Sequence, residues 1–112
     1  MQILIRMKFE KELRMAKTFA KQGSKVELLE EKSGLSSCDA IIDGKKVDFK
    51  SLSSSNNIIR HAKKAIRGQG ADFVYFEFTK KSYEIIGKIN QLKNIGIHGK
   101  YYFKGEDIVY DF

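Results

Sequence analysis

The dipeptide Asp43-Gly44 constrains the fold of this chain more than any other short stretch, because it separates two apolar runs. Residues 40–42 form the run before it, and the run after it contains Val47 and Phe49. Both central residues of a tight two-residue hairpin turn need a positive φ, which Asp and Gly tolerate. The sequence therefore predicts that residues 39–50 form an antiparallel β-hairpin.

The second strand of this hairpin carries two charged side chains that should lie on one face. Because side chains alternate along a strand, Asp48 and Lys50 should lie on one face, and Val47 and Phe49 on the other. Asp39 opens the first strand and should lie near Asp48. Two ionised carboxylates held close together favour a divalent cation with oxygen ligands, such as Mg²⁺ or Mn²⁺. A neighbouring lysine can offset phosphate charge, so the pattern indicates phosphodiester cleavage.

This spacing resembles the motif of the PD-(D/E)XK nuclease superfamily, the restriction-endonuclease-like enzymes. In that motif an Asp opens one strand, and an Asp or Glu, a variable residue and a Lys lie on the next. The matching residues are Asp39, Asp48 and Lys50, and Cys38 replaces the family's proline, which is not a ligand. The resemblance implies a metal-dependent nuclease.

The amino-acid composition is typical of a globular protein, and its positive charge is compatible with binding to nucleic acid. The chain has 112 residues, 42% of them hydrophobic, which predicts a single domain over residues 1–112. We expect no membrane contact, because no apolar run is long enough to span a bilayer and the N-terminus lacks a signal-peptide core. The single cysteine excludes an internal disulfide and fits a cytoplasmic site of action. The net charge of +7 favours a polyanionic partner.

Apolar periodicity and turn residues predict an α/β (α+β) fold with a mixed sheet flanked by helices. Glu10 and Glu12 would lie in the first turn of the first helix, where carboxylates suit the helix dipole. The order of elements matches the αβββαβ core of the restriction-endonuclease-like fold. Residues 1–7 could be a lead-in, a first strand or the start of the first helix, and the sequence does not decide between them. The predicted elements after them are a helix over 8–22, a strand over 25–29, a loop over 30–37, the hairpin, a helix over 56–67, a strand over 72–78, a helix over 80–93 and a terminal hairpin over 101–110.

The chain also resembles the C-terminal nuclease domains of contact-dependent growth inhibition and other polymorphic toxins. In those domains a helix with a Glu precedes a strand reading roughly DAIIDGKxxDFKS, and a Gln follows the next helix. The matching residues here are Glu12, Asp39, Asp48, Lys50, Ser51 and Gln69. The resemblance implies RNA, and tRNA in particular, as substrate. It also implies delivery within a larger secreted toxin and an immunity protein as partner, acidic because the domain is basic.

These arguments assign roles to a small set of residues. Asp39 and Asp48, assisted by Glu12 and the backbone carbonyl of Phe49, are the predicted ligands of Mg²⁺ or Mn²⁺. Lys50 would stabilise the charge on the phosphate, and Gln69 would orient water or anchor the end of the helix. Glu10 is a rival for the role of Glu12.

A basic stripe is predicted to contact phosphates beside this site. It follows the motif on the helix over 56–67, opposite that helix's apolar face. Ser51 is the further predicted contact to nucleic acid. The stripe consists of Arg60, Lys63, Lys64 and Arg67.

Two other classes of function stay open from the sequence. A metal-independent ribonuclease of the barnase, EndoU, colicin and RelE-like group would use His98 and Lys100, with Tyr101 and Arg60, as acid, base and phosphate ligands. A non-catalytic nucleic-acid or protein-binding module would keep the acidic pair as structure only. DNA is the alternative substrate for the metal-dependent enzyme.

Overall fold

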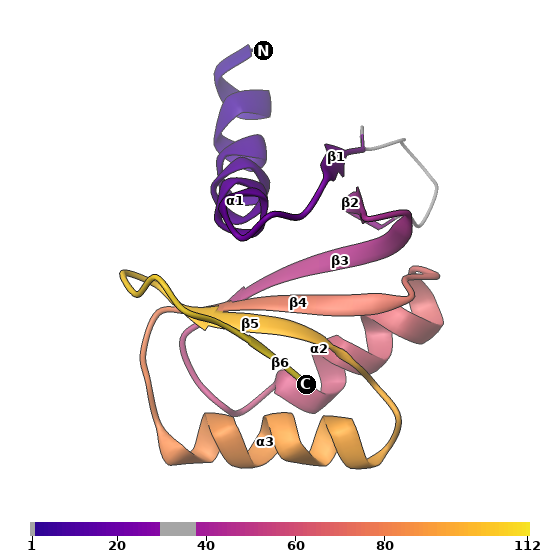
Figure 1. The fold of residues 1–112 in the computed structure, drawn as a ribbon, viewed down its shortest axis with the longest axis vertical. Helices are drawn as coiled ribbons and strands as arrows, with labels where there is room; N and C mark the ends of the chain where they lie inside the picture. The colour runs from indigo at the N-terminus through magenta and orange to yellow at the C-terminus, as the bar shows by residue number, and fades with distance from the viewer. Residues whose placement is uncertain (1, 30–37) are drawn as a thin grey trace.

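The computed structural model describes residues 2–29 and 38–112, and in the first helix it describes side chains from Glu10 onward. The predicted loop over 30–37 lies outside the described residues. One six-stranded sheet has helices on both sides (Figure 1). The elements are α1 (Gln2–Lys21), β1 (Val26–Leu28), β2 (Ala40–Ile42), β3 (Lys45–Leu52), α2 (Ile58–Lys63), a π-helical turn (Lys64–Gly68), β4 (Phe73–Phe78), α3 (Tyr83–Asn94), β5 (Gly99–Phe103) and β6 (Val109–Asp111).

The predicted hairpin is confirmed. Asp43 and Gly44 have φ values of 50° and 83°, so both turn residues adopt the positive φ that the tight turn needs. The strands β2 and β3 pair antiparallel, with Ala40 opposite Val47. The carboxylate of Asp43 accepts a hydrogen bond from the backbone N–H of Lys25 at 2.8 Å, which ties the turn to the start of β1.

The sheet is mixed, as predicted. Strands β1, β2 and β3 pair antiparallel, strands β3, β4 and β5 pair parallel, and β6 returns antiparallel to β5. The two parallel connections run through α2 and α3, because parallel neighbours need a crossover. The predicted α/β class is therefore confirmed, and helix, three strands, helix and strand follow in the predicted order.

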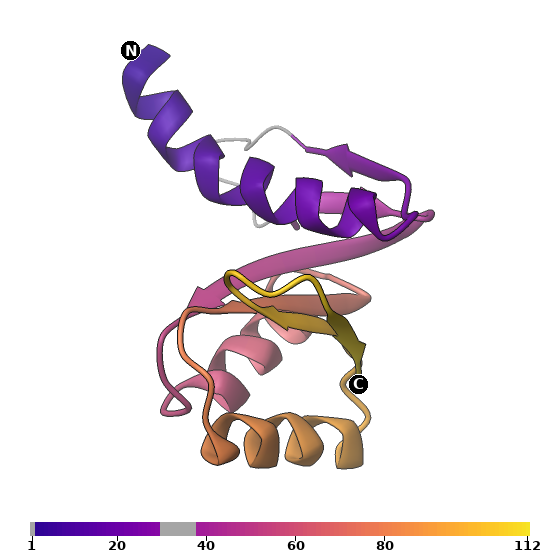
Figure 2. The ribbon, with the colours of Figure 1, turned by 60° about the vertical axis from the view of Figure 1, so that its left-hand side comes forward.

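Two apolar cores lie on the two faces of the sheet. On one face α1 packs through Met15 and Phe19 against Val47, Phe49 and Tyr75. On the other face α2 and α3 pack against the alternate residues of β4 and β5. Figure 2 shows α1 lying over β3 on the side opposite these two helices. Alternation therefore directs Asp48 and Lys50 away from the core of α1.

The first helix differs from its prediction. It begins at Gln2 instead of Lys8, since residues 2–7 are good helix formers without Gly or Pro. Its first turn holds no acidic residue, so the prediction that Glu10 and Glu12 serve the helix dipole was wrong. No helix among the described residues is long and apolar enough to cross a membrane.

Candidate active site

The site forms where β3 runs beyond the end of β2. The backbone N–H of Asp39 donates to the carbonyl oxygen of Val47 at 3.1 Å, and among the described residues this is the last backbone bond between the two segments at this end. The carboxylate of Asp39 then accepts from the backbone N–H of Phe49 at 2.8 Å. A side chain thus replaces the β2 backbone as the partner of β3, and it brings Asp39 to Asp48 as predicted.

Asp48 is the most buried charged group of the site, with 1% of its surface exposed. Its Oδ2 lies 2.9 Å from Nζ of Lys50. Burial, together with the hydrogen bond to the adjacent Asp39 carboxyl, raises the pKa of Asp48 to about 7, although Lys50 opposes the shift. Two carboxylates this close share one proton or require a cation between them. The pair is therefore prepared for a positively charged ligand.

Gln69 contacts the acidic pair from the end of the π-helical turn. With its amide oriented to satisfy both polar atoms, its nitrogen donates to Oδ2 and Oδ1 of Asp48 at 2.5 and 3.2 Å. Its backbone N–H donates to the carbonyl of Lys64 at 3.1 Å, which closes the turn. Gln69 thus anchors the helix end and also holds the Asp48 carboxylate in place.

The helix α1 brings a third carboxylate close to the backbone of β3. The Glu12 side chain is 17% exposed, and its Oε1 lies 3.8 Å from Nζ of Lys11. The same Nζ lies 3.5 Å from the carbonyl oxygen of Phe49. Glu12 Oε2 is buried and has no hydrogen-bond partner among the side chains that the structure describes. Glu10, the rival of Glu12, is exposed.

Lys11 is a residue of this site that sequence reasoning missed. It is one of 21 basic residues, and no spacing distinguishes it from the others. Only the packing of α1 over β3 brings its ammonium to the Phe49 carbonyl.

The donor atoms fit a hard divalent cation by their chemistry. Two carboxylates in contact, a backbone carbonyl and a buried, unpartnered carboxylate oxygen are the ligand types that Mg²⁺ and Mn²⁺ prefer. Within residues 2–29 and 38–112, however, no three His, Cys, Asp or Glu side chains are grouped closely enough to hold an ion by themselves. The complete ligand set of Asp39, Asp48, Glu12 and the Phe49 carbonyl therefore stays a prediction.

The predicted basic stripe lies on α2 and the π-helical turn. Arg60, Lys64 and Arg67 are exposed, and Lys63 is half-buried. Burial lowers the pKa of His61, and the charges of Lys50, Arg60 and Lys64 lower it further. Lys50 of the site and two residues of the stripe, Arg60 and Lys64, therefore act on the same imidazole, and these two residues are the part of the stripe nearest to Lys50 by this observation.

The family of the chain follows from comparison with known proteins. Residues 36–109 match the model of the contact-dependent growth inhibition CdiA C-terminal domain. The chain belongs to this family. The match covers the hairpin, Asp39, Asp48, Lys50, Gln69 and the basic stripe. Membership supports a toxin role for this CdiA C-terminal domain.

A solved structure shares the fold of this CdiA C-terminal domain. It is described as the CdiA-CT/CdiI toxin and immunity complex from Burkholderia pseudomallei. The similarity covers 95% of this chain and 86% of that chain, with a TM-score of 0.65 and 18% sequence identity. At that identity the likeness shows the fold alone. A search of curated proteins finds no match.

Ser51, a predicted nucleic-acid contact, lies on the α1 face of the CdiA C-terminal domain, opposite Asp48 and Lys50. Its hydroxyl donates to Glu77 Oε1 at 2.7 Å. Arg14 donates to both oxygens of Glu77 at 2.9 and 2.7 Å, and the Tyr102 hydroxyl donates at 2.6 Å. The structure therefore gives Ser51 an internal partner, in a cluster that the sequence analysis did not identify.

Glu77 is fully buried at the centre of this cluster. Burial opposes its ionisation, but the hydrogen bonds from Arg14, Tyr102 and Ser51 outweigh that effect and lower the pKa of Glu77 to about 2. The sequence contained one sign of this cluster. Glu77 lies inside the most β-prone stretch of the chain, where an isolated charge is unfavourable and therefore indicates a partner. The cluster attaches α1 to the sheet.

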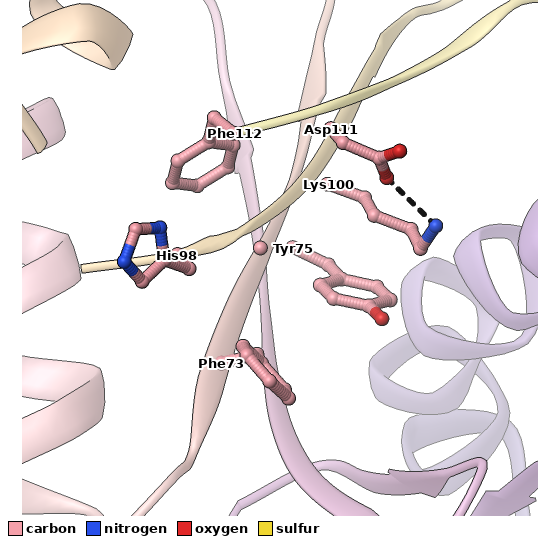
Figure 3. Close-up of a pocket in the computed structure, with 7 residues that line it drawn as sticks. Phe73, Tyr75, His98, Lys100, Asp111 and Phe112 are labelled. Carbon is pink, nitrogen blue, oxygen red and sulfur yellow. Dashed lines mark hydrogen bonds and ion pairs between the residues drawn. The ribbon is translucent and has the colours of Figure 1, made fainter. Parts of the chain in front are cut away.

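A hollow of about 240 Å³ lies at the other end of the sheet, along β4, β5 and β6 (Figure 3). Its lining includes His98 and Lys100, the acid–base candidates of the metal-independent reading. Lys100 Nζ is paired with Asp111 Oδ1 at 2.7 Å. Tyr101 is buried in the core on the opposite face, and Arg60 is not part of the lining. The structure does not bring these four residues together.

Proposed function

We propose that this CdiA C-terminal domain is a metal-dependent endonuclease of the PD-(D/E)XK type that cleaves RNA, with tRNA as its substrate. The observation that carries the proposal is the contact of the two carboxylates Asp39 and Asp48, with Lys50 Nζ 2.9 Å from Asp48, at the point where β3 leaves β2. A structural role alone does not account for the pair, because a buried Asp48 in contact with the half-buried Asp39 destabilises the fold unless a proton or cation joins the two carboxylates.

The residues of the site have distinct roles in the proposed reaction. Asp39, Asp48, Glu12 and the carbonyl of Phe49 would hold Mg²⁺ or Mn²⁺. When bound, the metal stabilises charge on the phosphate and supplies an acidic bound water. Gln69 holds the Asp48 carboxylate in position through its amide.

Lys50 has the second role in the reaction. Its ammonium is kept at the site by Asp48, and its side chain is 17% exposed, so we expect it to reach a phosphate oxygen. From there it stabilises the negative charge that develops as the phosphodiester bond breaks.

Charge supports a nucleic-acid substrate and an acidic partner. The net charge is +7, the side chains of Arg60, Lys64 and Arg67 are exposed, and the charges of Arg60 and Lys64 act on His61 together with that of Lys50. Phosphates of the RNA backbone would bind this stripe. The similar structure from Burkholderia pseudomallei is a toxin and immunity complex. We therefore propose that an acidic immunity protein inhibits this domain, and that a larger secreted toxin delivers it to the cytoplasm of a target cell.

The test is to incubate the purified protein with total tRNA and with plasmid DNA, each with Mg²⁺ and with EDTA. Asp48→Asn and Lys50→Met are the active-site variants. Lys45→Met is the matched control, because Lys45 lies on the same strand and is exposed. We expect Mg²⁺-dependent tRNA fragments from the wild type and from Lys45→Met, and none from the two active-site variants.

The other outcomes assign the other functions. Cleavage of tRNA that persists in EDTA and in the Asp48→Asn variant would favour a metal-independent ribonuclease. The His98→Ala variant would then test that function. Cleavage of plasmid DNA alone would make the domain a DNA endonuclease. Absence of cleavage of either polymer would favour a binding module.

A further inference from the structure

The ammonium of Lys11 lies among the oxygen atoms at one side of the candidate metal site. Its Nζ is 3.5 Å from the carbonyl oxygen of Phe49 and 3.8 Å from Oε1 of Glu12. These two oxygens come from different elements, β3 and α1, and the lysine lies between them. A cation therefore already occupies the position between two of the proposed metal ligands.

We propose that Lys11 is a resident counter-ion that holds the place of the metal, and that a divalent cation must displace its ammonium to bind Glu12 and Phe49. The inference rests on the proposed function, because it takes these two oxygens as ligands. It adds a residue that regulates metal affinity and that has no part in the motif.

The other cations near the site cannot take this place. Lys50 is paired with Asp48 on the opposite face of β3. Arg14 is held by both oxygens of Glu77. Among the side chains that the structure describes, Lys11 is thus the cation paired with Glu12. The other oxygen of Glu12, Oε2, is buried and has no partner in the described part of the chain, so the Lys11 ammonium satisfies the carboxylate only in part.

The position of Lys11 is set by its neighbour one turn along α1. Lys11 and Arg14 are three residues apart, so they lie on the same side of the helix. The bidentate bond from Arg14 to the fully buried Glu77 prevents α1 from sliding along the sheet. The bond therefore fixes the part of α1 from which Lys11 reaches the Phe49 carbonyl.

The need to displace the Lys11 ammonium lowers the affinity of the site for the metal. Binding of a divalent cation at the Glu12 side must break the contact of Lys11 with Glu12, and the displaced charge repels the ion. Within the described residues, no third acidic side chain lies close enough to Asp39 and Asp48 to hold an ion together with them. This agrees with a Glu12 carboxylate that is paired with Lys11. A variant with a neutral side chain at position 11 should then bind the metal more tightly than the wild type does.

The experiment measures Mn²⁺ binding by the loss of the free Mn²⁺ signal in electron paramagnetic resonance, without substrate. Lys11→Met should bind Mn²⁺ about tenfold more tightly than the wild type, the effect of removing one charge a few ångströms from the ion. Lys17→Met, which removes an exposed charge from the same helix, should stay within about twofold of the wild type. Lys11→Arg keeps the charge and should not bind more tightly than the wild type.

Thermal unfolding supplies a second readout. In EDTA, Lys11→Met should melt below Lys17→Met, because Glu12 loses its counter-charge, and Mn²⁺ should raise its melting temperature more than it raises that of the wild type. Equal Mn²⁺ affinity in Lys11→Met and Lys17→Met, with binding that still depends on Asp48, would overturn this inference and leave the proposed function standing. If the wild type binds no Mn²⁺, both are overturned.

Discussion

Lys50 Nζ lies 2.9 Å from Oδ2 of Asp48, two residues earlier on the same strand. Alternation puts the two side chains on one face of β3, and the burial of Asp48 draws the ammonium toward it. Asp39 and Gln69 approach the same carboxylate from β2 and from the end of the π-helical turn. The charges of the site are thus arranged before any ligand arrives.

The first prediction concerns the pH dependence of stability in EDTA. The pKa of Asp48 is raised from 3.8 to about 7 in the folded protein. The folded state holds this proton more tightly, so the stabilisation is complete below about pH 4 and is lost as the pH rises through 7. The melting temperature of the wild type should therefore fall, relative to that of Asp48→Asn, between pH 4 and pH 8. Circular dichroism melts at several pH values test this, and parallel curves would contradict it.

The second prediction concerns the basic stripe. The double variant Arg60→Gln/Arg67→Gln should bind tRNA more weakly in EDTA, and the slope of log affinity against log salt should fall by about 2. Lys88→Gln/Lys93→Gln removes the same charge from α3 and is the control. Fluorescence anisotropy at several salt concentrations measures both. Equal slopes in the two double variants would show that the stripe does not contact phosphates.

The third prediction concerns Glu77, whose pKa is lowered from 4.5 to about 2 by its hydrogen bonds. A depressed pKa stabilises the folded state above pH 4.5, and this contribution is lost as the pH falls toward 2. Glu77→Gln should destabilise the fold by about 2 kcal/mol at neutral pH, since it weakens the hydrogen bonds that Arg14, Ser51 and Tyr102 donate to a charged group. Urea unfolding should show the difference from the wild type narrowing below pH 4.5. A constant difference from pH 7 to pH 2.5 would argue against an ionised Glu77.

The fourth prediction concerns two glycines in different surroundings. A Cβ added at Gly99 would meet the backbone oxygen of Val74 at 1.8 Å, which no side-chain movement relieves. Gly99→Ala should therefore separate β4 from β5 and give insoluble or unfolded protein. Gly87 lies inside α3 with nothing within 4 Å of such a Cβ, and Gly87→Ala should stabilise the fold by about 0.5–1 kcal/mol. Soluble yield and urea unfolding of the two variants measure the contrast.

Much of the fold could be read from short stretches of the sequence. The positive φ values at Asp43 and Gly44 and the division of faces along β3 follow from rules that act over a few residues. The contact of Asp39 with Asp48 follows from the hairpin as well, because the turn sets the register. The start of α1 could not be read in this way, since helix formers alone did not separate a helix from a strand over residues 2–7.

The sequence by itself determined the hairpin, the order of elements, and the placement of Asp39, Asp48 and Lys50 at one end of β3. Only the tertiary structure decided that Lys11 reaches the Phe49 carbonyl, and that Arg14, Ser51 and Tyr102 meet at Glu77. The reason is physical. Alternation and turns act between neighbours in the chain, whereas these contacts join residues 25 to 63 positions apart. Those of Lys11 and Arg14 exist only once α1 has packed on the sheet, and those of Ser51 and Tyr102 only once the parallel strands have paired.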